Sequence, residues 1–205
     1  MPALIEDTMN ELEFIMGSVD TPMGAWRASL GYPEPWKINY VEIGNEDNLS
    51  GAETSYIDYR FPAFYDAISA KYPDIIIISS TGDTLAQLGS SATDYHEYAR
   101  PDYYASQFGF FDGIANRSHL TLLGEYANIQ GNNGQIESAN FSEPQLPFGI
   151  WVGSVGEAIY TLGAERNSYG IIGASYAPGF QNMNSYEWAV SFFFEILQGV
   201  LRLME

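Results

Sequence analysis

Four consecutive isoleucines at positions 75–78 constrain the fold of this chain more than any other stretch. A strand with one face in water alternates apolar and polar side chains, whereas a strand covered on both faces is apolar throughout. The isoleucine run shows no alternation, so it predicts a strand of a parallel sheet that is buried on both faces. Parallel neighbours need long crossover connections, which are usually helices.

Helical and strand-like segments alternate on both sides of this run. Helices are expected over about 4–16, 60–71, 101–111, 148–162 and 185–203, and strands over 40–43, 75–79, 120–124 and 169–175. Residues 93–98 read as a short strand end or loop, and 18–36 and 128–145 as longer loops. This α/β alternation predicts parallel strands in either a doubly wound sheet or a (β/α)8 barrel. The sequence has no Walker motif and no Gly-x-Gly-x-x-Gly after a strand, which disfavours nucleotide binding.

The composition narrows the classes of partner. The chain has 205 residues, enough for one domain with a sizeable core, and its net charge of −18 argues against nucleic acid and anionic membranes as partners. A strongly acidic protein suits a neutral ligand such as a sugar. There are no cysteines, so disulfides and thiolate metal sites are excluded. No membrane-spanning run is expected, and residues 1–17 do not resemble a signal peptide.

Two predicted strands end in the same way, "EIGNE" and "LLGEY", and each ending carries a glutamate, Glu46 and Glu125. The carboxyl ends of parallel strands are where active sites of barrels lie. Two carboxylates there suit glycoside hydrolysis, in which one protonates the leaving oxygen and the other attacks the anomeric carbon or activates water. The amide of Asn45, next to Glu46, is expected to bind a sugar 2-hydroxyl.

The two histidines receive different interpretations. His96, in "DYHEY" with Tyr98, lies near another predicted strand end and is expected to position a carboxylate or bind a sugar hydroxyl. His119 precedes a strand at the end opposite Glu125 and is expected to be structural. The acids and His96 match no metal-ligand spacing, so no metal is expected. Residues 153–156, "GSVG", lack the spacing of a serine nucleophile elbow.

Four segments in order, "NYVEIGNEDNL", "DYHEY", "TLLGEYA" and "GASYAPGFQN", resemble the catalytic domain of fungal-type α-L-arabinofuranosidases of glycoside hydrolase family 51. These are retaining (β/α)8 glycosidases. The resemblance implies an acid/base role for Glu46, a nucleophile role for Glu125, and substrate binding by Asn45, His96 and Tyr98. It implies no cofactor and no metal.

The resemblance also implies what the chain acts on and which part of the fold it forms. Expected substrates are arabinose-containing polysaccharides such as arabinan and arabinoxylan, cleaved by release of terminal α-L-arabinofuranosyl residues. Alternatives are another retaining glycosidase of the same clan, such as a β-xylosidase or endoglucanase, or a non-catalytic carbohydrate-binding or vestigial protein. An extracellular location is expected, and sequons at Asn48, Asn116 and Asn140 give it weak support.

The family pattern covers roughly residues 3–188 and begins at the helix before strand 4 of the barrel. Residues 1–205 are therefore expected to form a partial (β/α)8 domain with about strands 4 to 8. Strands 1 to 3 and the accompanying β-sandwich are expected to be absent. Because open sheet edges invite aggregation, the isolated chain is expected to be poorly stable and weakly active or inactive.

Overall fold

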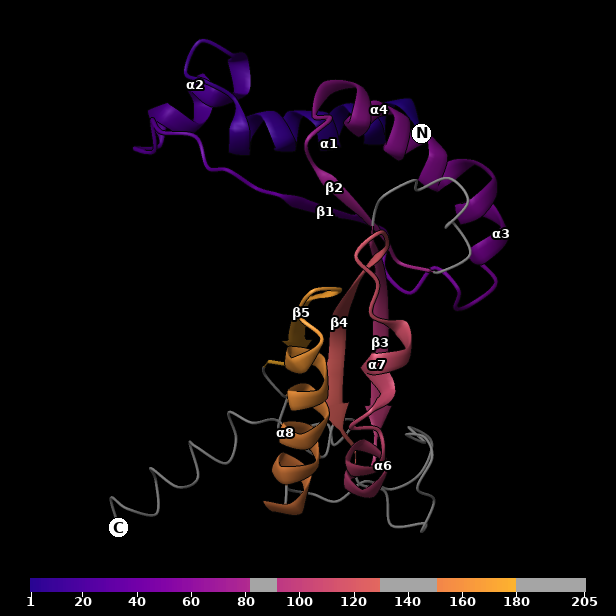
Figure 1. The fold of residues 1–205 in the computed structure, drawn as a ribbon. Helices are drawn as coiled ribbons and strands as arrows, with labels where there is room; N and C mark the ends of the chain where they lie inside the picture. Colours follow the sequence, from indigo (N-terminus) through magenta and orange to yellow (C-terminus); the bar gives the residue numbers. More distant parts are fainter. Residues whose placement is uncertain (82–91, 130–150, 180–205) are drawn as a thin grey trace, which may run out of the picture. The chain divides into compact units, whose positions relative to one another are not determined.

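The computed structural model describes residues 1–81, 92–129 and 151–179, and the chain divides into two compact units, Met1–Thr93 and Asp94–Glu205 (Figure 1). Each unit combines helices with parallel strands, which confirms the α/β class predicted from the sequence. Within the described residues, no helix combines the length and apolar character needed to cross a bilayer.

The first unit is built around strands β1 and β2. Its elements are α1 (Pro2–Met16), α2 (Pro22–Ser29), β1 (Tyr40–Ile43), α3 (Glu53–Ser55), the π-helical turn η1 (Tyr56–Arg60), α4 (Phe61–Lys71), β2 (Ile76–Ser79) and the first residues of β3 (Ala92–Ala99). β1 and β2 are parallel, with Tyr40 opposite Ile76 and Ile43 opposite Ser79. β2 then pairs in parallel with the start of β3.

The core of the first unit forms where α1 and α4 meet these strands. Its buried members are Leu12, Ile43, Tyr56, Phe61, Ile68 and Ile77. The isoleucine run supplies Ile77 and Ile78, which are only 2% and 3% exposed. Burying an isoleucine side chain contributes about 1.5–3 kcal/mol, so the run that predicted a buried strand also stabilises it.

The expected loop over residues 18–36 contains the helix α2, so that prediction was wrong in part. Thr21 precedes the helix, and its hydroxyl accepts the amide hydrogen of Gly24 at 3.2 Å. Pro22 occupies the first helical position, where its missing N–H costs nothing. Arg27 of this helix is fully buried, and its guanidinium donates to the carbonyls of Phe14 at 2.6 Å and of Pro33 at 3.0 Å, among others. The Thr-Pro start signal was present in the sequence, and the buried arginine explains why so short a helix persists.

The second unit contains the rest of β3, then α6 (Pro101–Ser106), α7 (Phe110–Ile114), β4 (Leu120–Asn128), α8 (Trp151–Arg166) and β5 (Ile171–Tyr176). β4 lies between β3 and β5 in hydrogen-bonded order, and β4 and β5 are parallel. Helix α8 packs on β4 and β5, as Figure 1 shows. The core combines Ala99, Tyr104, Phe111, Leu123, Tyr160, Ala164 and Ile171.

Several predicted boundaries in this unit differ from the structure. The segment 93–98, expected to be a short strand end or a loop, belongs to a full strand of eight residues. The helix expected over 101–111 is two short helices, α6 and α7. β4 extends to Asn128, so Glu125 lies inside the strand rather than just after it. The helix expected over 185–203, and most of the loop expected over 128–145, fall outside the described residues.

Helix α8 does not bury all of its apolar side chains. Val152 and Val155, which share a helical face with Ile159, are 51% and 42% exposed. The buried side instead includes Gly156, Tyr160 and Ala164. Small residues permit close approach to α6 and β4, and this packing outweighs the hydrophobicity of the valine face.

Candidate active site

The turn after β1 presents Asn45 and Glu46. Gly44 has φ of +92° and Glu46 has φ of +48°, so the backbone enters the left-handed region twice within three residues. Only glycine adopts such angles without cost, and a non-glycine residue there signals local strain that its surroundings must hold. Asn45 is exposed and Glu46 is half-buried. The strained turn therefore holds both predicted site residues at the surface of the first unit.

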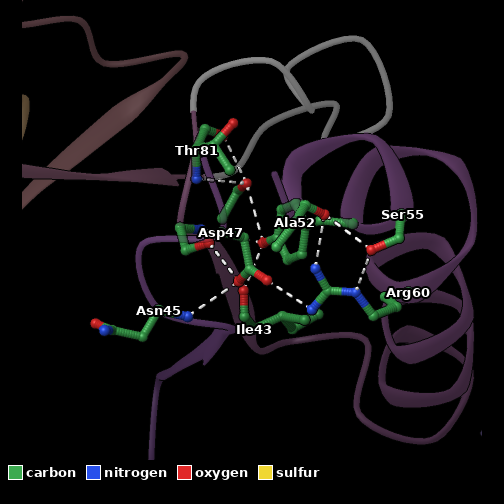
Figure 2. A network of polar contacts seen from close by, with 10 residues as sticks. Ile43, Asn45, Asp47, Ala52, Ser55, Arg60 and Thr81 are labelled. Carbon is green, nitrogen blue, oxygen red and sulfur yellow. Dashed lines mark hydrogen bonds and ion pairs between the residues drawn. The ribbon is translucent and has the colours of Figure 1, made fainter. Parts of the chain in front are cut away.

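The carboxylate of Asp47 holds this turn in place (Figure 2). Its Oδ1 pairs with Nη1 of Arg60 at 2.6 Å. Its Oδ2 accepts the amide hydrogen of Asn45 at 3.1 Å and the hydroxyl hydrogen of Ser80 at 2.9 Å. Because Asp47 is only 6% exposed, these contacts are shielded from water and stronger than surface pairs. Figure 2 shows the Asn45 side chain extending away from the network, so its amide is directed outward.

Tyr56 joins the ends of β1 and β2. Its hydroxyl donates to the carbonyl of Ile43 at 2.5 Å and accepts the amide hydrogen of Ser80 at 3.1 Å. Burial raises the pKa of Tyr56, so the phenol stays protonated and able to donate. One buried side chain thus fixes the carboxyl ends of β1 and β2, and the end of β1 leads directly into the Glu46 turn.

The second unit gathers a second set of predicted residues around Glu125. Tyr98 donates a hydrogen bond of 2.5 Å from its hydroxyl to Oε2 of Glu125. Nδ1 of His96 lies 3.4 Å from the same oxygen. His96 and Tyr98 are two residues apart on β3, so they project from the same face of the strand. Strand periodicity therefore brings both side chains to one carboxylate of the neighbouring strand.

Asp94 completes this cluster, and the sequence interpretation did not include it. Its Oδ2 lies 2.5 Å from Nε2 of His96, and its Oδ1 accepts the amide hydrogen of Gly124 at 2.8 Å. The Asp94 side chain is 3% exposed. A signal was available, because Asp94 shares the two-residue spacing of His96 and Tyr98 along the strand. We call Asp94, His96, Tyr98 and Glu125 the β3–β4 polar cluster.

The opposite face of β3 carries a separate polar pair that belongs to the core. Tyr95 donates to Oε2 of Glu97 at 2.7 Å, and Tyr104 donates to the carbonyl of Glu97 at 2.6 Å. Burial raises the pKa of Glu97, although the hydroxyls of Tyr95 and Tyr103 oppose that shift. These contacts join the other face of β3 to the core of the second unit.

The predicted residues thus fall into two groups. Asn45 and Glu46 lie together in the turn of the first unit, and His96, Tyr98 and Glu125 lie together in the second. His119 lies directly before β4, far along the strand from Glu125, and burial lowers its pKa. The structural role expected for His119 stays a prediction.

The sequence is similar to a known family model and to several fungal proteins. The family model described as "Alpha-L-arabinofuranosidase 1 domain" matches residues 1–117. Alpha-L-arabinofuranosidase A of Aspergillus niger is 44% identical over 188 residues, which is 90% of this chain and 27% of that protein. The probable enzyme of Emericella nidulans is 35% identical over 92% of this chain and 32% of its own length. The chain therefore spans about a third or less of the relatives it matches.

Solved structures agree with the sequence relatives. An arabinose-bound GH51 α-L-arabinofuranosidase shares 33% identity with a TM-score of 0.78, covering 91% of this chain and 30% of that protein. The Thermotoga maritima α-L-arabinofuranosidase, at 16% identity and a TM-score of 0.63, shares the fold. Because the family model matches more than half of its residues, the chain belongs to the α-L-arabinofuranosidase family, glycoside hydrolase family 51.

Proposed function

We propose that this protein is a retaining glycoside hydrolase that releases terminal α-L-arabinofuranosyl residues from polysaccharides such as arabinan and arabinoxylan. The observation that carries the proposal is the carboxylate of Glu125, held by Tyr98 and faced by His96 in a chain of this family. A nucleophile must attack from a fixed position, and two side chains on one strand provide that constraint.

Glu125 is the proposed nucleophile. Its Oε2 receives the Tyr98 hydrogen bond and faces His96, so we assign the attack on the anomeric carbon to Oε1. Attack forms a glycosyl ester and releases the aglycone, and water then cleaves the ester in a second step. When the ester breaks, negative charge returns to the carboxylate, and the same two side chains stabilise it there.

Glu46 is the proposed general acid and base. In the first step it protonates the departing oxygen, and in the second it takes a proton from the attacking water. Asn45, directed outward from the Asp47 network, is the proposed hydrogen-bond partner of the sugar 2-hydroxyl. The strained turn supports this assignment because such backbone strain collects at functional sites.

The experiment is hydrolysis of an aryl α-L-arabinofuranoside by the full-length protein and by its Glu125→Ala variant. The variant should lose nearly all turnover, and added azide should restore it and yield the glycosyl azide of inverted configuration. Glu97→Gln is the matched control, because Glu97 is a half-buried acid on the adjacent strand and contacts Tyr95 instead. Hydrolysis by Glu125→Ala without azide, at the wild-type rate, would refute the nucleophile assignment.

A panel of aryl glycosides tests the sugar specificity. Preference for the α-L-arabinofuranoside over the β-D-xyloside and β-D-glucoside supports the proposal, and the reverse order indicates another retaining glycosidase. Binding of arabinose without turnover of any substrate would indicate a carbohydrate-binding protein.

We also propose that β1 to β5 correspond to strands 4 to 8 of a (β/α)8 barrel. The support is the parallel pairing of neighbouring strands and the match to 30% of a much longer solved relative. An experimental structure of the full-length protein tests this assignment.

Secretion is a further proposal, supported by sequons whose asparagines, Asn48 and Asn116, are exposed. A mobility shift of the native protein on enzymatic deglycosylation tests it.

A further inference from the structure

His96 lies between two carboxylates. Its Nε2 is 2.5 Å from Oδ2 of Asp94, and its Nδ1 is 3.4 Å from Oε2 of Glu125. A neutral imidazole donates through one nitrogen and accepts through the other, whereas an ionised carboxylate only accepts. Both ring nitrogens therefore face acceptors, and only the imidazolium form matches this arrangement on both sides.

Asp94 is also held by the strand that carries Glu125. Its second oxygen accepts the amide hydrogen of Gly124, the residue before Glu125. A Cβ on Gly124 would lie 2.1 Å from that oxygen, so the Asp94 carboxylate occupies the space that a side chain at 124 would need. One buried carboxylate thus touches both the backbone that leads into Glu125 and the imidazole that faces its side chain.

We propose that Asp94 is a positioning residue for Glu125, keeping His96 as an imidazolium against the Glu125 carboxylate while it holds the Gly124 amide. The inference rests on the proposed function for its catalytic consequence, but the charge state of His96 is a property of the folded protein alone.

Two carboxylates of the described part of the second unit face His96. Asp94 faces it from its own strand β3, and Glu125 faces it from β4. Glu97, also on β3, bonds to Tyr95 on the other side of the strand. Opposite charges a few ångströms away favour the charged form of a histidine, and the nearly dry Asp94 side chain is the closer of the two.

The catalytic consequence lies in the second step. An imidazolium beside Glu125 stabilises the carboxylate as the ester breaks and the electron pair of the C–O bond returns to it. A neutral ring provides a weaker interaction, so cleavage of the ester should slow more than its formation. Loss of the Asp94 charge should therefore lower kcat, and KM should fall with it because the ester accumulates.

Asp94→Asn is the matched substitution. The asparagine keeps an oxygen for the Gly124 amide and offers an NH₂ group to Nε2 of His96, so every hydrogen bond can survive while the charge is lost. Nitrogen-15 NMR of histidine-labelled protein then reads the ring directly. The chain has two histidines, and His119→Gln assigns their signals.

In the wild type, the His96 ring should carry protons on both nitrogens at neutral pH. In Asp94→Asn it should be neutral there, with its midpoint lower by about 1–3 pH units. A neutral His96 ring in the wild type, or an unchanged midpoint in the variant, would overturn the proposal. This readout does not require turnover, so failure of the proposed function leaves it decisive.

Kinetics on an aryl arabinofuranoside give the second readout. We expect Asp94→Asn to lower kcat about 10–100-fold, the usual cost of losing a partner that orients a site residue, with a smaller change in kcat/KM. Glu97→Gln, a neutralised acid on the other face of β3, should leave both constants near wild type. Equal kcat values for Asp94→Asn and wild type would refute the catalytic part of the inference.

Discussion

The hydroxyl of Tyr98 donates a 2.5 Å hydrogen bond to Oε2 of Glu125, and these residues come from neighbouring strands, β3 and β4. On the other face of β3, Tyr95 donates to Glu97 at 2.7 Å. One strand thus carries two tyrosine–carboxylate pairs of similar geometry. His96 contacts Glu125, so only one of the pairs belongs to the proposed site. The other is a natural control.

Tyr98→Phe should slow hydrolysis without unfolding the protein. The change removes a hydrogen bond to a charged group, worth about 1.5–3 kcal/mol, which corresponds to a loss in kcat of about 10–100-fold. Steady-state kinetics on an aryl α-L-arabinofuranoside measure this effect. Tyr95→Phe removes the equivalent bond on the other face and should lower the unfolding free energy while kcat stays near wild type. Equal losses of kcat in both variants would contradict the assignment.

Gly124→Ala should destabilise the second unit through one identifiable clash. The new Cβ would lie 2.1 Å from Oδ1 of Asp94, which forces the strand or the carboxylate to move. Overpacking of this kind costs about 1–3 kcal/mol of unfolding free energy. Urea denaturation should show that the same substitution costs less in an Asp94→Ala background, where the clashing oxygen is gone. Strictly additive losses in the double variant would show that Asp94 is not the obstacle.

Asp47→Ala should loosen the turn that carries Glu46. The substitution leaves Arg60 without its buried partner and Asn45 and Ser80 without their acceptor, so we expect a loss of about 2–4 kcal/mol in unfolding free energy. Thermal and urea denaturation measure it. Asp58→Ala is the control. It removes an exposed acid from η1, two residues before Arg60, and should change the unfolding free energy by less than about 0.5 kcal/mol. A matching loss in both variants would argue against the Asp47 network.

Glu97 should make the protein less stable as the pH rises. Burial raises the folded-state pKa of Glu97 above the 4.5 of an exposed glutamate, so the folded form binds its proton more tightly than the unfolded form does. Its favourable contribution is complete below the unfolded pKa and is lost as pH rises through the folded one. Glu97→Gln cannot ionise, so its stability relative to wild type should increase from about pH 4 to pH 7. Urea unfolding measures the difference in unfolding free energy between Glu97→Gln and wild type. A difference that does not change with pH would contradict the raised pKa of Glu97.

Local sequence patterns were reliable for the first two strands. The unalternating isoleucines gave β2 almost to the residue, and Tyr40–Ile43 is β1 as expected. The prediction of β2 succeeded because burial on both faces leaves a continuous apolar run in the sequence. Patterns were less reliable for helix α8, whose valine face is exposed, because hydrophobic spacing does not reveal where small residues allow close packing.

The sequence alone determined the α/β class and the positions of the strands β1 and β2. Each of these depends on residues within a few positions of one another. Only the tertiary structure decided that Asp94 accepts a hydrogen bond from the amide of Gly124, 30 residues away. It also decided that Asp47 accepts one from the hydroxyl of Ser80, 33 residues away. A buried carboxylate must find partners wherever the fold brings donors to it, and that choice is made by packing between strands rather than by any local pattern.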